Sequence, residues 1–168
     1  MVLDVPVFLQ RDAECGNTSL KSVFWHFGSR LSARRLGELA RCTADGTNHD
    51  GMIDAARAGG FEVEAGAGGT IARLRGHLRR GHPVIVGWWA MEPGDRHFRA
   101  AWNLDERRAR DCGHYSVVCG LDARRLRLMD PSLGMRWVPI RDFLRVWYDT
   151  DTDAYELVRR WYLVAYRV

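Results

Sequence analysis

The stretch GHYSVVCGLDARRLRLMDP, residues 113–131, contains two apolar runs with a short polar break between them. The runs, residues 114–121 and 124–130, have the length and the side-chain types that are typical of β-strands. Asp122 and Ala123 lie between them, and two residues are enough to connect adjacent antiparallel strands. The stretch therefore predicts a β-hairpin.

This hairpin brings a histidine close to a carboxylate. If the strands pair about the predicted turn, residue 114 lies opposite roughly residue 131, so His114 and Asp130 are near neighbours across the ladder. A carboxylate in that place can fix the tautomer of the imidazole and stabilise the imidazolium. Asp130 followed by proline is also typical of a turn start, and the two interpretations are compatible.

The rest of the chain predicts helices first and strands later. Helical spacing of apolar residues, with Ser32 and Thr70 as caps and glycines as terminators, predicts helices over 15–27, from 32 onward, over 51–58, over 71–80 and over 140–149. Further strands are expected over 61–65, 83–89, 135–140 and 161–168. This order predicts an α+β fold with N-terminal helices packed on a mostly antiparallel sheet, and we expect residues 1–168 to form a single domain.

The composition limits the possible functions. The chain has 168 residues, is 46% hydrophobic and contains seven tryptophans, so it can bury a core. Its net charge of +4 comes from arginines interspersed with acids, without the clustered basic face of a nucleic-acid binder, so we expect no nucleic-acid partner. The N-terminus has no signal-peptide pattern, and the longest apolar run, residues 84–91, is too short to cross a bilayer.

The four cysteines are expected to be free thiols in the reducing cytoplasm. They are Cys15, Cys42, Cys112 and Cys119. Cys112, His114 and Cys119 are close enough in sequence to raise the alternative of a zinc site, but the chain has no Cys-x-x-Cys pair. We therefore expect no metal and no cofactor.

Cys15 stands where the first helix is predicted to begin, followed by Gly16. The ordinary pKa of a cysteine thiol is about 8.5, and a helix N-terminus together with a neighbouring histidine can lower such a pKa to about 3–4. Gly16 can allow a substrate backbone to approach closely, and the Cys15 N–H can donate to a developing oxyanion. Cys15 is therefore a candidate nucleophile.

A nucleophilic cysteine needs a base, and His114 is the histidine that fits best. It opens a strand, follows Gly113, and precedes an apolar run that would hold it rigidly. The other five histidines lie in predicted helices, turns or loops, where such residues are more often structural: His26, His49, His77, His82 and His97.

Gln10 lies five residues before Cys15. A side-chain amide just upstream of the nucleophile can donate its N–H to the same oxyanion as the Cys15 N–H. The ordered set of Gln10, Cys15, His114 and Asp130 is more specific than any one of these residues alone.

With these motifs the sequence resembles the papain-like cysteine peptidases of the bacteriocin-processing, double-glycine leader type. The resemblance covers residues 5–149 and rests on Gln10 and on CGNTSLKSVFWHFG, GMIDAARAGGF, GHPVIVGWW, GHYSVVCGLD and LMDPSLG. It implies the papain-like fold, with an active-site cleft between a helix and the sheet. It also implies Cys15 as nucleophile, His114 as base and then acid, Asp130 as orienting residue and Gln10 as oxyanion donor.

Two positions depart from the family pattern. The glutamine usually stands six residues before the cysteine and here stands five, and Asn17 replaces the common proline after Cys-Gly. The chain also lacks the transmembrane and ATP-binding domains of the transporter-linked members, so it is expected to be a stand-alone relative.

The resemblance implies a peptidase that cleaves a peptide or protein substrate through a thioester, for example after Gly-Gly. An acyl or peptidyl transferase, or a peptide ligase, needs the same residues and remains an alternative, as does a peptide-binding module without chemistry. Gly16, Gly113 and Trp88 are the expected substrate contacts, although a strand tryptophan is more often part of the core. Residues 91–112, charged and without a clear period, are expected to form a loop that narrows the cleft or selects the substrate.

Overall fold

The computed structural model describes residues 1–89, 113–150 and 157–167. The helices are α1 (Cys15–His26), α2 (Ala33–Leu39), α3 (His49–Ala58), α4 (Ile71–Arg79) and α5 (Ile140–Val146). The strands are β1 (Glu62–Gly66), β2 (Val84–Trp89), β3 (Gly113–Leu121), β4 (Arg125–Asp130), β5 (Gly134–Pro139), β6 (Tyr148–Thr150), β7 (Leu157–Arg159) and β8 (Tyr162–Tyr166). The loop expected over 91–112 lies outside the described residues.

Side-chain caps define where three of the helices begin. Ser32 accepts a hydrogen bond from the N–H of Arg35, and Thr70 accepts one from the N–H of Arg73, so both predicted caps are confirmed. Asn48 caps α3 in the same way, and that helix therefore begins two residues earlier than the sequence predicted.

The main sheet has six strands in the order β1-β8-β2-β3-β4-β5, and each described pair is antiparallel. The predicted class, helices with a mostly antiparallel sheet, is confirmed. The helix expected over 140–149 is too long, because α5 ends at Val146 and Tyr148–Thr150 form β6, which pairs with β7. A three-residue strand is too short to show the alternation that identifies strands in a sequence.

The β3–β4 hairpin is present, but its predicted register is one residue out. Val117 pairs with Met129, whereas the predicted turn would have paired it with residue 128. The connection contains three residues, with the Asp122 carboxylate accepting the N–H groups of Arg124 and Arg125, and a β-bulge shifts the ladder near Gly120. Next to the turn Leu121 pairs with Leu126, two residues beyond its predicted partner, and the extra residue that the bulge places in β3 reduces the difference to one.

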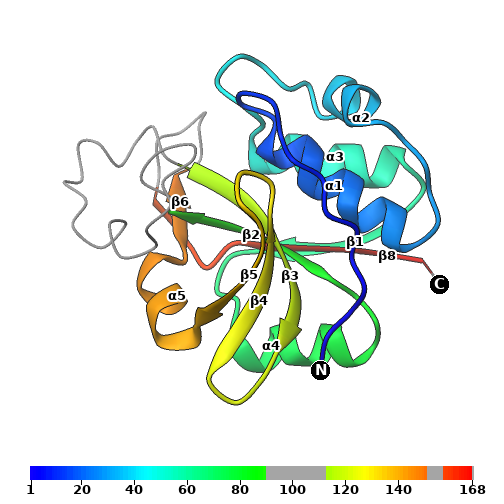
Figure 1. Cartoon of the computed structure of the whole chain (residues 1–168). Helices are drawn as coiled ribbons and strands as arrows, with labels where there is room; N and C mark the ends of the chain where they lie inside the picture. Colours follow the sequence, from blue (N-terminus) through cyan, green and yellow to red (C-terminus); the bar gives the residue numbers. More distant parts are fainter. Residues whose placement is uncertain (90–112, 151–156, 168) are drawn as a thin grey trace.

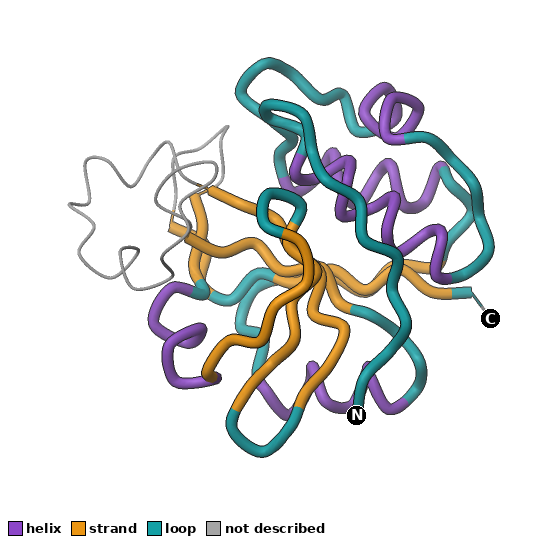
Figure 2. The backbone as a smooth tube through the Cα atoms, viewed as in Figure 1, coloured by secondary structure: helices purple, strands orange, loops and turns teal. Residues whose placement is uncertain are grey.

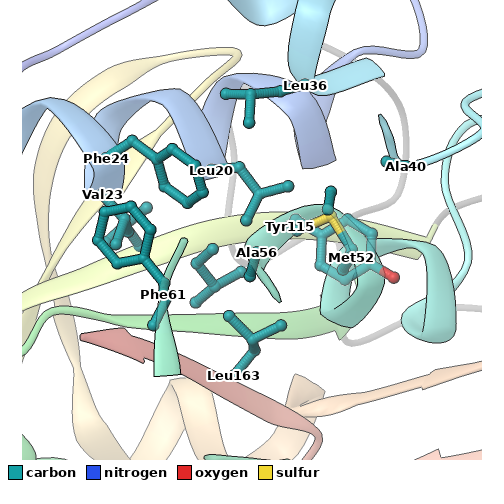
Figure 3. Close-up of a cluster of buried hydrophobic side chains, with 14 of the residues drawn as sticks. Leu20, Val23, Phe24, Leu36, Ala40, Met52, Ala56, Phe61, Tyr115 and Leu163 are labelled. Atoms are coloured by element: carbon teal, nitrogen blue, oxygen red, sulfur yellow. The ribbon is translucent and has the colours of Figure 1, made fainter. Parts of the chain in front are cut away.

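Two apolar cores cover the two faces of the sheet. The helices α1, α2 and α3 are grouped together, away from α4 and α5 (Figure 1). Figure 3 shows the first core, in which Leu20, Phe24 and Met52 of these helices pack with Tyr115 of β3 and Leu163 of β8. Residues of α4 and α5 pack with the sheet in a second core. The buried face of α1 therefore fixes the position of its N-terminal residue against the sheet.

The segment before α1 is an extended loop (Figure 2). It begins at Met1, beside the C-terminal end of β3, and runs to the N-terminus of α1. The Met1 amino group donates to the carbonyl of Leu121, and the N–H of Gln10 donates to the carbonyl of Pro131. Within the described part of the chain, no helix has the length and apolar character needed to cross a membrane.

Candidate active site

Cys15 is the first residue of α1 and is partly exposed. Its neighbours Gly16, Asn17, Thr18 and Ser19 are buried, so the first turn of the helix is held firmly. Glu14 at the N-cap makes no side-chain capping hydrogen bond, and the first turn carries no acidic residue. The partial positive charge of the helix N-terminus thus remains available to stabilise an anionic sulfur.

His114 and Asp130 form a buried hydrogen-bonded pair. The distance between His114 Nε2 and Asp130 Oδ1 is 3.0 Å, and the two residues are 7% and 1% exposed. The predicted proximity is therefore confirmed, in spite of the change in register. Burial opposes ionisation of the imidazole, but the hydrogen bond with Asp130 and the interaction with Cys15 outweigh burial and raise the pKa of His114 to about 10.

Asp130 is held by three donors. Its Oδ1 also accepts the N–H of Ser132 at 2.9 Å, and its Oδ2 accepts Nη2 of Arg136 at 2.6 Å. Burial favours the neutral acid, but His114, Arg136 and the Ser132 N–H together lower the pKa of Asp130. The carboxylate is thus fixed in orientation and kept ionised.

Arg136 was not identified from the sequence. It lies on β5, in the hairpin that follows Asp130, and its side chain is 20% exposed. An arginine on a strand usually faces solvent, so the position of Arg136 in the sequence does not indicate a contact with Asp130. The β4–β5 pairing, in which Asp130 lies opposite Gly134, brings the long guanidinium side chain back to the carboxylate.

Trp88 lies opposite His114 in the β2–β3 ladder, and its expected contact with substrate stays a prediction. It is 2% exposed, and its ring meets the His114 ring edge-on at a centroid distance of 5.4 Å. Its Nε1 donates to Ser116 Oγ, and the Arg136 guanidinium lies 5.7 Å from its ring centroid. Trp88 is therefore a buried residue that packs against the His114 ring and the Arg136 guanidinium.

Gln10 reaches the neighbourhood of the site through its backbone but not through its amide N–H. Its main-chain N–H donates to Pro131, directly after Asp130. Its Nε2 donates to the carbonyl of Asp12 at 2.6 Å, in a turn where Asp12 has a φ of 36°. The Gln10 side chain is thus folded onto its own loop.

The two glycines expected at the substrate have close neighbours in the interior. A Cβ on Gly16 would lie 2.8 Å from the Met52 sulfur and 3.3 Å from Tyr115 Cδ2. A Cβ on Gly113 would collide with the Asp149 carboxylate. A side chain at either position would force its neighbour to move, and the expected contacts of Gly16 and Gly113 with substrate stay predictions.

The structure gives no support to the zinc alternative within the described residues, which contain no cluster of potential ligands. Cys119 is buried, with its thiol directed at the carbonyl of Arg127, and burial raises its pKa to about 11. Cys112 lies outside the described residues.

The sequence model of the Peptidase_C39 like family matches residues 2–155. The chain belongs to the Peptidase_C39 like family. A curated relative of uncharacterized function from Methanothermobacter thermautotrophicus is 28% identical over 143 residues, which are 85% of this chain and 82% of the relative. One from Methanothermobacter marburgensis is 30% identical over 120 residues, 71% of this chain and 66% of the relative.

Solved peptidase domains share the fold of this Peptidase_C39 like protein. The peptidase domain of Streptococcus ComA aligns with a TM-score of 0.68 and 24% identity, over 98% of this chain and 100% of that domain. A C39-like peptidase from Bacillus anthracis aligns with a TM-score of 0.71 and 17% identity, over 99% of this chain and 98% of that one. The resemblance to double-glycine leader peptidases is thereby confirmed at the level of family and fold.

Proposed function

We propose that this protein is a cysteine peptidase that cleaves a peptide bond through a thioester intermediate, with Cys15 as nucleophile. The family and the fold support a cysteine peptidase. The observation that carries the proposal is the buried His114–Asp130 pair, whose histidine also interacts with Cys15 at the start of α1.

The arrangement supplies each proton that the reaction moves. Asp130 engages Nε2 of His114, which leaves Nδ1 for the thiol of Cys15. Nδ1 of His114 takes the proton of the Cys15 thiol, the sulfur attacks the substrate carbonyl carbon, a C–S bond forms, and the carbonyl oxygen becomes an oxyanion near the Cys15 N–H. When the oxyanion collapses and the C–N bond breaks, the His114 imidazolium gives its proton to the leaving amine. His114 then takes a proton from water, which attacks the thioester carbon. The C–S bond breaks, His114 returns the proton to the sulfur, and the acid leaves.

Gln10 is assigned as the second oxyanion donor. For this role its amide must leave the Asp12 carbonyl when the substrate arrives, which a rotation of its side chain achieves. The exchange replaces one hydrogen bond to a neutral oxygen by a stronger one to an oxyanion, so it is favourable only in the transition state.

The proposed substrate is a leader or precursor peptide that is cut after small residues such as Gly-Gly. A structural relative, a double glycine motif protease solved in complex with the leader peptide, shares the fold at a TM-score of 0.65 and 19% identity, over 98% of this chain and 92% of that one. Cys15 is partly exposed, so a peptide can reach it from solvent.

The test incubates Gly-Gly precursor peptides with the wild type and with Cys15→Ala, and identifies the products by mass spectrometry. We expect cleavage by the wild type and none by Cys15→Ala, while Cys42→Ala, which changes another partly exposed thiol, retains cleavage. Added amine nucleophiles separate hydrolysis from acyl transfer, because transfer gives an amide product of higher mass. Cleavage that survives in Cys15→Ala contradicts the proposal.

A further inference from the structure

A second buried histidine–aspartate pair lies next to the first. His49 Nε2 is 3.3 Å from Asp149 Oδ2, and the two side chains are 8% and 5% exposed. His49 is the first residue of α3 and Asp149 is the middle residue of β6, one hundred positions away. Burying a carboxylate together with an imidazole has a large desolvation penalty, so the presence of this pair in the interior calls for an explanation.

Aromatic rings fix the orientation of His49. Its ring stacks on Trp161 with a centroid distance of 4.2 Å and an interplanar angle of 10°. It meets the ring of Tyr115, the residue after His114, edge-on at 5.9 Å. His49 is thus in contact with the strand that carries the proposed base.

Two glycines make room for the Asp149 carboxylate against the ends of β2 and β3. A Cβ on Gly87 would lie 2.8 Å from Asp149 Oδ2 and 3.3 Å from His49 Nε2, and a Cβ on Gly113 would collide with Asp149 Oδ1. Gly113 directly precedes His114. The carboxylate therefore rests against the backbone from which the His114 side chain projects.

The charges that act on Asp149 connect the two pairs. Burial raises the pKa of Asp149, while the hydrogen bond with His49, the N–H of Thr150 and the positive charge of His114 act in the opposite direction. Among the described residues, His49 of α3 and His114 of β3 thus both favour the ionised carboxylate. A positive charge on His114 and a negative charge on Asp149 stabilise each other by the same amount, since the coupling is reciprocal.

We propose that His49 and Asp149 form a positioning pair for the active site, in which Asp149 supports the β3 backbone at Gly113 and adds a second negative charge that stabilises the His114 imidazolium. His49 holds the carboxylate in place with a hydrogen bond. This inference rests on the proposed function, because it gives the pair a role in keeping His114 charged for its proton transfer to the leaving amine. Neither residue contacts the reacting atoms.

The test measures how fast iodoacetamide alkylates Cys15 as a function of pH, with the Cys15 peptide quantified by mass spectrometry. Removing the negative charge of Asp149 destabilises the His114 imidazolium, so in Asp149→Asn we expect the alkaline step of this profile, at which the imidazolium loses its proton, to move to lower pH by about half a unit to one unit. His49→Gln should move this step in the same direction, because Asp149 then loses the hydrogen bond that holds it beside β3.

Two variants serve as matched controls. Asp142→Asn changes another buried aspartate, on α5, and His77→Gln changes another buried histidine, on α4, which pairs with Glu64 at 3.4 Å. Both are expected to keep the wild-type profile. The inference is overturned if folded Asp149→Asn and His49→Gln give profiles that coincide with those of the controls.

Nitrogen-15 NMR of the His114 ring provides a readout that does not depend on cysteine chemistry. In His49→Gln, and in Asp149→Asn where that variant folds, the ring should titrate at lower pH than in the wild type. If wild-type Cys15 is alkylated no faster than Cys42, the proposed function fails, and the NMR titration still decides whether Asp149 stabilises the imidazolium. Unchanged His114 titration in the folded variants overturns the inference.

Discussion

The guanidinium of Arg136 donates to the Asp130 carboxylate over 2.6 Å, on the oxygen that His114 leaves open. The aspartate of the proposed triad is therefore held from two sides, by the imidazole on one oxygen and by an arginine on the other. The arginine restrains rotation of the carboxylate and so maintains the direction of the His114 ring.

Replacing Arg136 by glutamine should impair both stability and activity. We expect the free energy of unfolding to fall by about 1–3 kcal/mol. This decrease is smaller than the one expected when a fully buried ion-pair partner is removed, because a fifth of the Arg136 side chain is exposed. We also expect kcat/KM to fall by about 10-fold, since Asp130 becomes less well oriented. Denaturant unfolding and peptide cleavage check the two effects. The control is Arg141→Gln, which removes an 87% exposed arginine from another aspartate and should change stability by less than about 0.5 kcal/mol.

The raised pKa of His114, about 10, predicts the alkaline limit of the reaction. The leaving amine needs a proton from the imidazolium, so kcat/KM should fall as the pH rises through this value. In Asp130→Asn the imidazolium loses its main hydrogen-bond acceptor, so the limit should move to lower pH and kcat should fall by about 10²–10⁴-fold. A pH–rate profile of both proteins tests this, and an alkaline limit that is the same in both contradicts it.

Acid stability should depend on Asp130 and Asp149 with opposite signs. The folded pKa of Asp130 is lowered, so its contribution is present above the ordinary pKa, about 3.9, and is lost as the pH falls through the folded value. In Asp130→Asn the free energy of unfolding should therefore decrease less steeply than in the wild type as the pH falls. The folded pKa of Asp149 is raised, so protonation of this group stabilises the folded state as the pH falls. Asp149→Asn removes this stabilisation, so its free energy of unfolding should decrease more steeply in acid than that of the wild type. Equilibrium unfolding between about pH 3 and 6 measures both slopes.

Gly16→Ala should disturb the first turn of α1. The new Cβ would lie 2.8 Å from the Met52 sulfur, so the methionine or the helix has to move. We expect a destabilisation of about 1–3 kcal/mol and a reduced rate of Cys15 alkylation. The matched control is Gly76→Ala within α4, where the nearest neighbouring atom is 4.0 Å away, and where alanine should stabilise the helix by up to about 1 kcal/mol. Equal effects of the two substitutions contradict the packing argument.

Gln10→Ala tests the assignment of the second oxyanion donor. Loss of a donor that acts only in the transition state should lower kcat by about 10²–10³-fold and leave KM nearly unchanged. If the amide only braces the turn at Asp12, kcat stays within about fivefold of the wild type and stability alone decreases. Steady-state kinetics together with thermal unfolding separate these results.

Local sequence patterns were sufficient for much of the fold. The helical period of Leu20, Val23 and Phe24, the caps Ser32 and Thr70, and the alternation of helices and strands follow from interactions between residues a few positions apart. The pairing of His114 with Asp130 could also be predicted, because a hairpin is a local structure in which turn length constrains the register. The turn shifted the pairing by two residues and the bulge restored one of them, so the predicted contact was kept.

The tertiary structure decided which additional side chains surround these residues. Arg136 reaches Asp130 only because β5 folds back beside β4, and Trp88 covers the pair because β2 lies beside β3. His49 and Asp149 lie one hundred residues apart, and no spacing rule connects them. The sequence by itself determined the local elements and the chemical types of the candidate residues. Their final neighbours depend on how the sheet brings distant segments together, which local periodicity does not encode.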